Sequence, residues 1–216
     1  MRRFSISKQF ETNPPITDRV SMVCRMFGVS IDRLKDNQRI HKADLEVEDG
    51  DVIYVTGPSG AGKSVLLREM QNALDPREYI ALDEIPLPAD KAAIDCINAG
   101  LTIEALRLLG YAGLSDVFCM LTAPANLSEG QKYRFRLACA LASGKKFIFA
   151  DEFCSNLDRI TAAVIAYNVR RFAKRNNVTF FLASSHEDVL ADLQPDVLVV
   201  KRFTGPAEVT YRKLRI

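Results

Sequence analysis

The segment "VIYVTGPSGAGKS", residues 52–64, decides the fold class. It opens with an apolar, β-branched run, which is typical of a strand that is buried on both faces. The part that follows, "GPSGAGKS" at residues 57–64, matches the pattern G-x-x-x-x-G-K-[ST]. In that pattern bare backbone N–H groups surround phosphate oxygens at the N-terminus of a helix, where the helix dipole favours anions. The segment therefore predicts a nucleotide-binding phosphate loop, and the alternative is a glycine turn that matches by accident.

Each residue of this loop is a candidate ligand of the nucleotide. Lys63 is expected to reach the β- and γ-phosphates, and the Ser64 hydroxyl is expected to bind Mg²⁺. The complete set of candidate residues is Gly57, Pro58, Ser59, Gly60, Ala61, Gly62, Lys63, Ser64 and Val65.

Outward from the loop, apolar strand patterns alternate with helical ones. This alternation predicts an α/β fold with a mostly parallel sheet that helices cover on both faces, in one domain over residues 1–216. Strands are expected at 43–48, 52–56, 78–84, 146–152, 178–185, 196–203 and 208–216, and helices at 17–28, 63–74, 90–120, 126–141, 159–177 and 187–193.

Two pairs of acidic residues follow predicted strands. In "FIFADE" the strand ends at Asp151 and Glu152, and in "YIALDE" at Asp83 and Glu84. Ligands of open α/β sheets bind at the carboxyl ends of the strands. We assign Asp151 to Mg²⁺ and Glu152 to the base that activates water, because of the residues that follow this pair. Two solvated acids that merely end a strand are the alternative.

Composition sets limits on location and partners. The net charge is +2, which gives no general attraction to nucleic acid or anionic lipid. No apolar run approaches the ~20 residues of a membrane span, and the N-terminus lacks the apolar stretch of a signal peptide. Five scattered cysteines without a CxxC pair indicate reduced thiols, so we expect a cytoplasmic protein.

The stretch "NLSEGQKYRFRLACAL", residues 126–141, reads as an amphipathic helix with a glycine in its first turn. Glycine costs roughly 1 kcal/mol there relative to alanine, so a bare backbone has a use at this place. Ser128 is a good N-cap, and Gln131 stands three residues later, as in a capping box. Capping alone would explain these two residues but not Gly130.

Five motifs in a fixed order resemble those of the ATP-binding-cassette (ABC) ATPases, over about residues 43–200. They are the Walker A loop "GPSGAGKS", the signature "LSEGQ", the Walker B strand "FIFADE", the D-loop "SNLD" and the switch histidine His186.

This resemblance implies a P-loop fold with a helical lobe over about residues 86–140, and a homodimer that binds ATP and Mg²⁺. In the family two cassettes pair head to tail, with ATP between the Walker A loop of one and the signature of the other. Ser128, Gly130 and Gln131 would then contact nucleotide held by the partner chain. His186 would reach the γ-phosphate, with a solvated histidine as the alternative, and Asp158 would link the two sites.

The chain departs from the family pattern at several places. The usual Q-loop glutamine is missing, and Asp83 is the best positional match as a further Mg²⁺ contact. Phe153 replaces the usual proline after the catalytic glutamate. Phe27 is either the aromatic residue that stacks on adenine or, as we favour, a core residue of its helix. His41 is expected in a polar turn and receives no role.

Three interpretations of the ATP hydrolysis stay open. A soluble ABC ATPase that acts on a protein or nucleic-acid partner is favoured, because the Q-loop glutamine that couples transporters to their membrane subunit is absent. The departures are similar to those of soluble ABC ATPases associated with acetyltransferase-like domains. The ATP-binding subunit of a membrane transporter is the alternative. A nucleotide-dependent clamp with little turnover is the third, and Glu152 argues against it.

Overall fold

The structure, a computed structural model, describes residues 1–10, 15–31 and 39–212. Six strands form the main sheet in the order β4-β5-β6-β3-β7-β8. Neighbouring strands are parallel from β4 to β7, and β8 pairs antiparallel with β7. The expected mostly parallel α/β sheet is confirmed. The strands are β3 (Val52–Thr56), β4 (Tyr79–Ala81), β5 (Phe147–Ala150), β6 (Thr179–Ala183), β7 (Val197–Val200) and β8 (Glu208–Tyr211).

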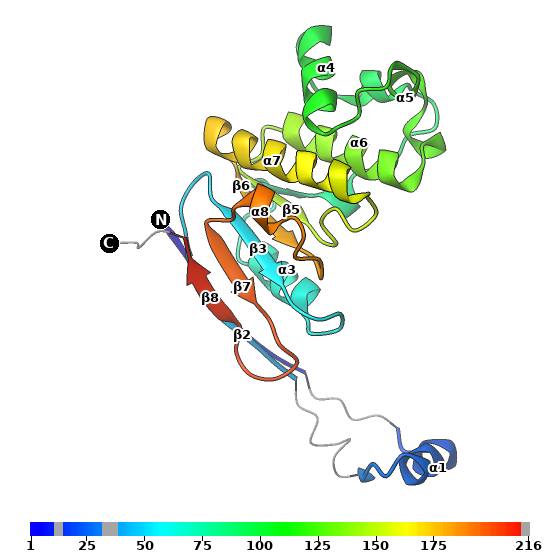
Figure 1. Ribbon diagram of the computed structural model, residues 1–216, viewed down its shortest axis with the longest axis vertical. Helices are drawn as coiled ribbons and strands as arrows, with labels where there is room; N and C mark the ends of the chain where they lie inside the picture. The colour runs from blue at the N-terminus through cyan, green and yellow to red at the C-terminus, as the bar shows by residue number, and fades with distance from the viewer. Residues whose placement is uncertain (11–14, 32–38, 213–216) are drawn as a thin grey trace.

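The central strands β3, β5 and β6 are buried along their whole length. Successive side chains point to opposite faces, so Tyr54 packs with one group of helices and Ile53 with another. Figure 1 shows α6 and α7 on one face of the sheet and α3 on the other. The helices are α3 (Lys63–Asn72), α6 (Glu129–Ala142) and α7 (Arg159–Asn176). The parallel strands therefore share one carboxyl edge, and the phosphate loop follows β3 at that edge.

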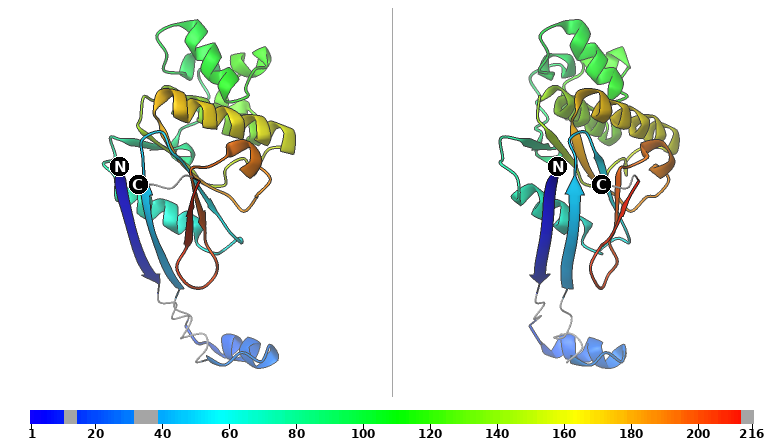
Figure 2. Two further views of the ribbon diagram at one scale, coloured as in Figure 1. Left: turned by 60° about the vertical axis from the view of Figure 1, so that its left-hand side comes forward. Right: turned by 90° about the vertical axis from the view of Figure 1, so that its left-hand side faces the viewer.

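A second sheet of two antiparallel strands lies beside α3. It pairs β1 (Arg2–Phe10) with β2 (Arg39–Val47), and both strands run side by side in Figure 2. Our sequence analysis did not predict β1. The signal was the alternation of Phe4 and Ile6, which are buried, with exposed serines. The Phe4 ring packs edge-on against Phe181 of β6 with centroids 5.3 Å apart, which joins this sheet to the core.

A helical lobe stands between β4 and β5 in sequence and lies above α6 in Figure 1. It contains α4 (Thr102–Tyr111) and α5 (Val117–Leu121). The prediction of helix across residues 90–120 was therefore only partly right. The segment Ala93–Cys96 makes a single 3₁₀ turn, and the chain then breaks at residues 98–100, where Asn and Gly favour turns.

Helix α1 (Asp18–Met26) forms where the sequence predicts it, with Thr17 as its N-cap and Gly28 at φ 64° after its end. It projects beyond the open end of the β1–β2 pair (Figure 1). Of its residues only Cys24 is buried. Phe27 is 77% exposed, so its interpretation as a core residue was wrong.

The last helix in the chain, α8 (Leu190–Leu193), is short and precedes β7. Among the residues that the structure describes, none of the helices combines the length and the apolar character that a membrane span requires. The five cysteines are all free thiols.

Candidate functional site

The phosphate loop is built from three glycines with positive φ. Gly57 has φ 142°, Gly60 75° and Gly62 96°, values that favour glycine over every L-residue. A Cβ on Gly57 would lie 2.0 Å from the carbonyl oxygen of Lys201. A Cβ on Gly60 would meet nothing within 4 Å. Gly57 is thus required by packing as well as by its backbone angle, whereas Gly60 faces open space.

Lys63, the first residue of α3, is buried with 5% exposure. Its ammonium donates to the carbonyl oxygens of Gly57 at 2.9 Å and Pro58 at 3.1 Å. It also donates to Ser185 Oγ at 2.9 Å, across 122 positions in the sequence. All three acceptors are uncharged oxygens. They hold the ammonium in place without neutralising it, so its charge is available to a phosphate.

The remaining loop residues divide by exposure. Pro58, Ser59 and Gly60 form an exposed outer lip, Ala61 is buried, and Ser64 and Val65 are half-buried in the first turn of α3. Gly62 is the N-cap of α3 and supplies no side-chain cap to its first turn. A helix that starts in this way presents its first N–H groups to an anion.

Asp151 and Glu152 follow β5 at the same edge of the sheet. The Glu152 N–H donates to Asp151 Oδ1 at 3.0 Å. Glu152 has φ 51° and Cys154 φ 59°, left-handed values that cost of order 1–3 kcal/mol each. The turn is anchored by Phe153, whose buried N–H donates to the carbonyl oxygen of Ala183 at 2.7 Å. A proline at this position would have no N–H to donate. The hydrogen bond to Ala183 therefore explains why this chain has Phe153 where the family usually has proline.

Asp83 lies in the 3₁₀ turn Leu82–Glu84 after β4 and is exposed. Ala81 of β4 pairs with Phe149 of β5. Asp83 and Asp151 therefore stand at equivalent places, each two residues beyond this pair, on neighbouring strands. The carboxyl edge brings both predicted acids to the same side of the sheet.

His186 is exposed and follows β6 at this edge. Its backbone N–H donates to Ser184 Oγ at 3.2 Å, and its backbone carbonyl oxygen accepts a hydrogen bond from the Tyr54 phenol. Burial raises the pKa of Tyr54 to about 12, so the phenol keeps its proton at neutral pH. The loop Ser184–His186 thus contacts β3 through Tyr54 and the phosphate loop through Ser185.

His41 was expected in a polar turn, and that expectation was wrong. It lies in β2 with 4% exposure. A Cβ on Gly62 would come within 2.0 Å of His41 Cε1, so the imidazole packs directly on the phosphate loop. The fold brings it there because the β1–β2 pair lies beside α3.

The turn before α6, Leu127–Gln131, is called the signature turn below. It contains a complete capping box. The Gln131 N–H donates to Ser128 Oγ at 3.4 Å, and the Ser128 N–H donates to Gln131 Oε1 at 2.9 Å. The Gln131 amide also donates to Cys119 Sγ at 3.0 Å. The capping interpretation of Ser128 and Gln131 is therefore confirmed for this chain.

Gly130 and Asp158 also have roles within the chain. A Cβ on Gly130 would lie 3.2 Å from Leu157 Cδ2 and 3.3 Å from the carbonyl oxygen of Asn156, so the signature turn packs on the D-loop. Asp158 is the N-cap of α7 and accepts from the Thr161 N–H at 3.0 Å. Hydrogen bonds from Thr161 lower the pKa of Asp158. The packing of Gly130 on the D-loop is therefore a reason within the chain for a glycine at this place.

These residues fit a nucleoside triphosphate with Mg²⁺. The uncapped start of α3 and the Lys63 ammonium provide donors and positive charge for phosphate oxygens. Within residues 1–10, 15–31 and 39–212, no group of three or more His, Cys, Asp and Glu side chains forms a metal cage. Mg²⁺ seldom requires one, because it usually keeps water and phosphate oxygens beside one or two protein ligands. Ser64 and Asp151, with Asp83 on the neighbouring strand end, are the side chains that could hold the ion.

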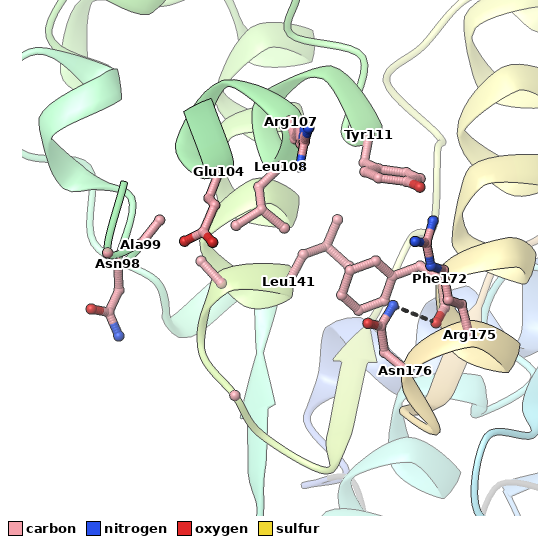
Figure 3. A pocket seen from close by; sticks show the side chains of 13 residues that line it. Asn98, Ala99, Glu104, Arg107, Leu108, Tyr111, Leu141, Phe172, Arg175 and Asn176 are labelled. Atoms are coloured by element: carbon pink, nitrogen blue, oxygen red, sulfur yellow. Dashed lines mark hydrogen bonds between the residues drawn. The ribbon is translucent and has the colours of Figure 1, made fainter. Parts of the chain in front are cut away.

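A cleft of about 800 Å³ lies elsewhere, between the lobe and the C-terminal ends of α6 and α7. Figure 3 shows Leu108, Leu141 and Phe172 beside it, with Glu104 and Arg175 among its polar residues. Because α6 and α7 end near the amino ends of the strands, this cleft is separate from the phosphate loop. A smaller cavity of about 190 Å³ is lined by D-loop residues and His186.

Several residues near the site were not found from the sequence. Ser185 contacts Lys63, Ser155 Oγ donates to Glu152 Oε2 at 2.9 Å, and Tyr54 secures the His186 loop. Serine is common in turns and tyrosine in strands, so no local pattern distinguished them. The available signals were position, since Ser184 and Ser185 directly precede the histidine, and for Ser155 its place at the start of the D-loop motif.

Sequence comparison finds ATP-binding proteins. The chain is 30% identical over 202 residues to the methionine import ATP-binding protein MetN 1 of Pseudomonas fluorescens, covering 77% of this chain and 60% of the relative. It is 29% identical over 219 residues to MetN 3 of Pectobacterium atrosepticum, covering 84% and 61%. The chain thus spans about three fifths of the length of these relatives. No family model matches the chain.

Structural comparison finds the same fold in solved cassettes. A dimeric ATP-binding cassette with bound ADP and Pi has a TM-score of 0.66 at 19% identity, and the match covers 82% of this chain and 93% of that one. A second cassette of an ABC transporter, in its ADP conformation, has a TM-score of 0.60 at 17% identity, with 79% and 84% covered. At these identities the comparison establishes the fold.

Proposed function

We propose that the chain is an ATP-binding-cassette nucleotide-binding domain, which binds MgATP and hydrolyses it as a head-to-tail dimer. Its sequence relatives and its fold support this proposal. One observation carries the proposal. The Lys63 ammonium sits at the start of α3 with only uncharged acceptors, and its partner Ser185 belongs to the same loop as His186. A positive charge held in this way, beside a carboxylate on the next strand end, suits phosphoryl transfer to water.

Each residue has a distinct task in this scheme. Lys63 and the N–H groups of residues 60–65 hold the phosphates, and the Ser64 hydroxyl and Asp151 hold the ion. Bound Mg²⁺ neutralises phosphate charge that develops in the reaction. Glu152 orients a water molecule and accepts its proton, and His186 donates a hydrogen bond toward the γ-phosphate. Asp83 is placed to support the ion through water, from the neighbouring strand.

The partner chain completes the site in this proposal. Ser128 and Gly130 stand at the N-terminus of α6, a helix whose dipole favours an anion. Ser128 is exposed, and its side chain is bonded only within the capping box. A second copy turned head to tail would bring its nucleotide to this helix end. Gln131 would support that contact indirectly, because its side-chain oxygen already accepts from Ser128 and its side-chain nitrogen already donates to Cys119.

We further propose that hydrolysis drives a membrane transporter, with the chain on the cytoplasmic side. The relatives are named as methionine import ATP-binding proteins, and this favours the transporter over the soluble ATPase that the missing Q-loop glutamine favoured. The lobe also carries apolar side chains that suit a partner protein. The exposed ones are Leu101, Ile103, Leu106, Val117, Phe118 and Leu121.

A soluble ABC ATPase with a protein or nucleic-acid partner is the second candidate. The observation behind it is the turn Leu82–Glu84, which holds Asp83 where transporter cassettes of the family have a glutamine. The two candidates differ in what the lobe binds.

A purification experiment tests the proposal and separates the candidates. The tagged chain is purified from detergent-treated native cells, as wild type and as Phe118→Asp, and its ATPase activity is measured. Co-purification of a multispanning protein with the wild type, lost in Phe118→Asp, supports transport. A water-soluble partner or nucleic acid at stoichiometric yield supports the second candidate. Absence of ATP hydrolysis in every preparation overturns the ATPase proposal itself.

A further inference from the structure

A chain of hydroxyl groups connects the loop of His186 with Glu152. The His186 N–H donates to Ser184 Oγ at 3.2 Å, Ser184 Oγ lies 3.4 Å from Ser155 Oγ, and Ser155 Oγ donates to Glu152 Oε2 at 2.9 Å. These groups come from the carboxyl ends of β6 and β5, so the chain crosses between neighbouring strands. Ser155 is the first residue of the D-loop motif, whereas Ser184 belongs to none of the five motifs.

Proton count fixes the direction of two of these hydrogen bonds. A carboxylate only accepts, so the single proton of Ser155 points to Glu152. Ser184 Oγ accepts from the backbone N–H of His186. The Ser184 proton has two acceptors within reach, the Tyr54 phenol and Ser155 Oγ. When it points to Ser155, all donors point toward the carboxylate, and each bond polarises the next.

Burial keeps the first half of the chain in place. Ser184 has 0% exposure, and so has Tyr54, whose phenol donates to the carbonyl oxygen of His186. The His186 peptide is thus held at both ends, its carbonyl by Tyr54 and its N–H by Ser184. The second half, Ser155 and Glu152, is more exposed and lies in the turn with left-handed φ values.

We propose that Ser184 and Ser155 are positioning residues that hold the Glu152 carboxylate in register with the His186 loop. This inference rests on the proposed function, because it concerns the orientation of the base for water. Movement of the His186 loop on a γ-phosphate is then transmitted to Glu152 through two hydroxyls. The 3.4 Å link is the longest of the three and is expected to shorten in the complex, as catalytic hydrogen bonds often do.

Steady-state kinetics with purified protein test this role. Ser155→Ala and Ser184→Ala should each lower kcat about tenfold and leave KM for ATP within about twofold, because neither hydroxyl touches the nucleotide. The double variant should also lose about tenfold, since the hydroxyls act in series on one carboxylate. Ser155→Thr, which keeps a hydroxyl, should restore kcat to within about twofold of wild type.

Ser143→Ala serves as the matched control. Its hydroxyl donates to the carbonyl oxygen of Ala140 at the far end of α6, at 2.6 Å, and its removal should leave kcat unchanged. Ser155 is half-buried, so its alanine variant keeps the test valid even where Ser184→Ala folds poorly. Circular dichroism confirms the fold of each variant.

The outcomes separate this inference from the proposed function. Wild-type kcat in Ser155→Ala, or a loss of kcat of about a hundredfold in the double variant, overturns the positioning role of the two serines. The proposed function survives that outcome as long as Glu152→Gln still abolishes turnover. A threonine variant as slow as the alanine variant overturns the positioning role too. A wild-type protein without ATP hydrolysis overturns both proposals.

Discussion

The catalytic edge and the signature turn are built in opposite ways. At the catalytic edge, formed by residues 57–65, 151–155 and 184–186, the hydrogen bond from Lys63 to Ser185 spans 122 sequence positions. The bond from Tyr54 to His186 spans 132. In the signature turn, Ser128 and Gln131 bond to each other across three positions. The first region depends on the whole sheet, whereas the capping box of the second is formed by neighbouring residues.

This difference implies that the two regions fail differently when they are mutated. A change at the catalytic edge should stop chemistry in each chain that carries it. A change in the signature turn should act on the fold through the cap and on chemistry through the partner. The following substitutions separate these effects.

The largest effect is expected for Glu152→Gln at the catalytic edge. Loss of a general base lowers turnover about 10²–10⁴-fold, while ATP binding persists because the phosphate contacts remain. Uncleaved MgATP should then hold two chains together. Light scattering of Glu152→Gln with and without MgATP measures this dimer.

The same dimer tests the role of the signature turn. Adding Ser128→Arg to Glu152→Gln should give a monomer that still binds ATP at Lys63. A protein that stays monomeric as Glu152→Gln with saturating MgATP would leave the signature turn as a helix cap alone.

Lys63→Ala should lower turnover about 10²–10³-fold and weaken ATP affinity, since the proposal places the ammonium on the phosphates both in the bound nucleotide and in the reaction. Lys91→Ala in the lobe, an exposed lysine, is the control for loss of one positive charge. Fluorescent-nucleotide titration and phosphate release measure the two effects. Wild-type affinity in a folded Lys63→Ala protein would contradict the assignment.

The glycines of the phosphate loop provide a stability prediction within one region. Gly57→Ala places a Cβ 2.0 Å from a backbone oxygen and should cost about 3 kcal/mol or more in the free energy of unfolding. Gly60→Ala meets open space and should cost only about 1 kcal/mol, from its positive φ. Urea denaturation measures both variants. Equal losses of unfolding free energy in the two variants would show that the positive φ, and not packing on Lys201, is the reason for glycine at position 57.

The smallest effect is expected for Ser128→Ala, which removes the cap of α6 and should cost about 1 kcal/mol of stability. Ser128→Asp tests the two roles separately. Aspartate is a good N-cap and should restore stability, but its charge repels the γ-phosphate of the partner site and should lower turnover further. Thermal unfolding and phosphate release compare the three proteins. Recovery of both quantities in Ser128→Asp would argue against contact with nucleotide.

Much of the fold could be predicted from the sequence, because its elements have strong local signals. The strands β3, β5 and β6 are continuous apolar runs, and α7 follows the caps and periodicity that its sequence shows. β1 was missed because four of its nine residues are charged or glutamine and its alternation is short. The interpretations of Phe27 and His41 failed for one reason. Local sequence does not tell which side of an element the rest of the chain covers.

The sequence by itself determined the motifs and their order, since the phosphate loop, the acids after β5 and the cap of α6 are each written in a few adjacent residues. Only the tertiary structure decided how these motifs cooperate. Parallel pairing brought Asp83 level with Asp151, sheet order placed Ser185 on Lys63, and the β1–β2 pair set His41 on Gly62. Contacts between different strands, loops and helices arise from strand order and packing, which no short stretch of sequence encodes.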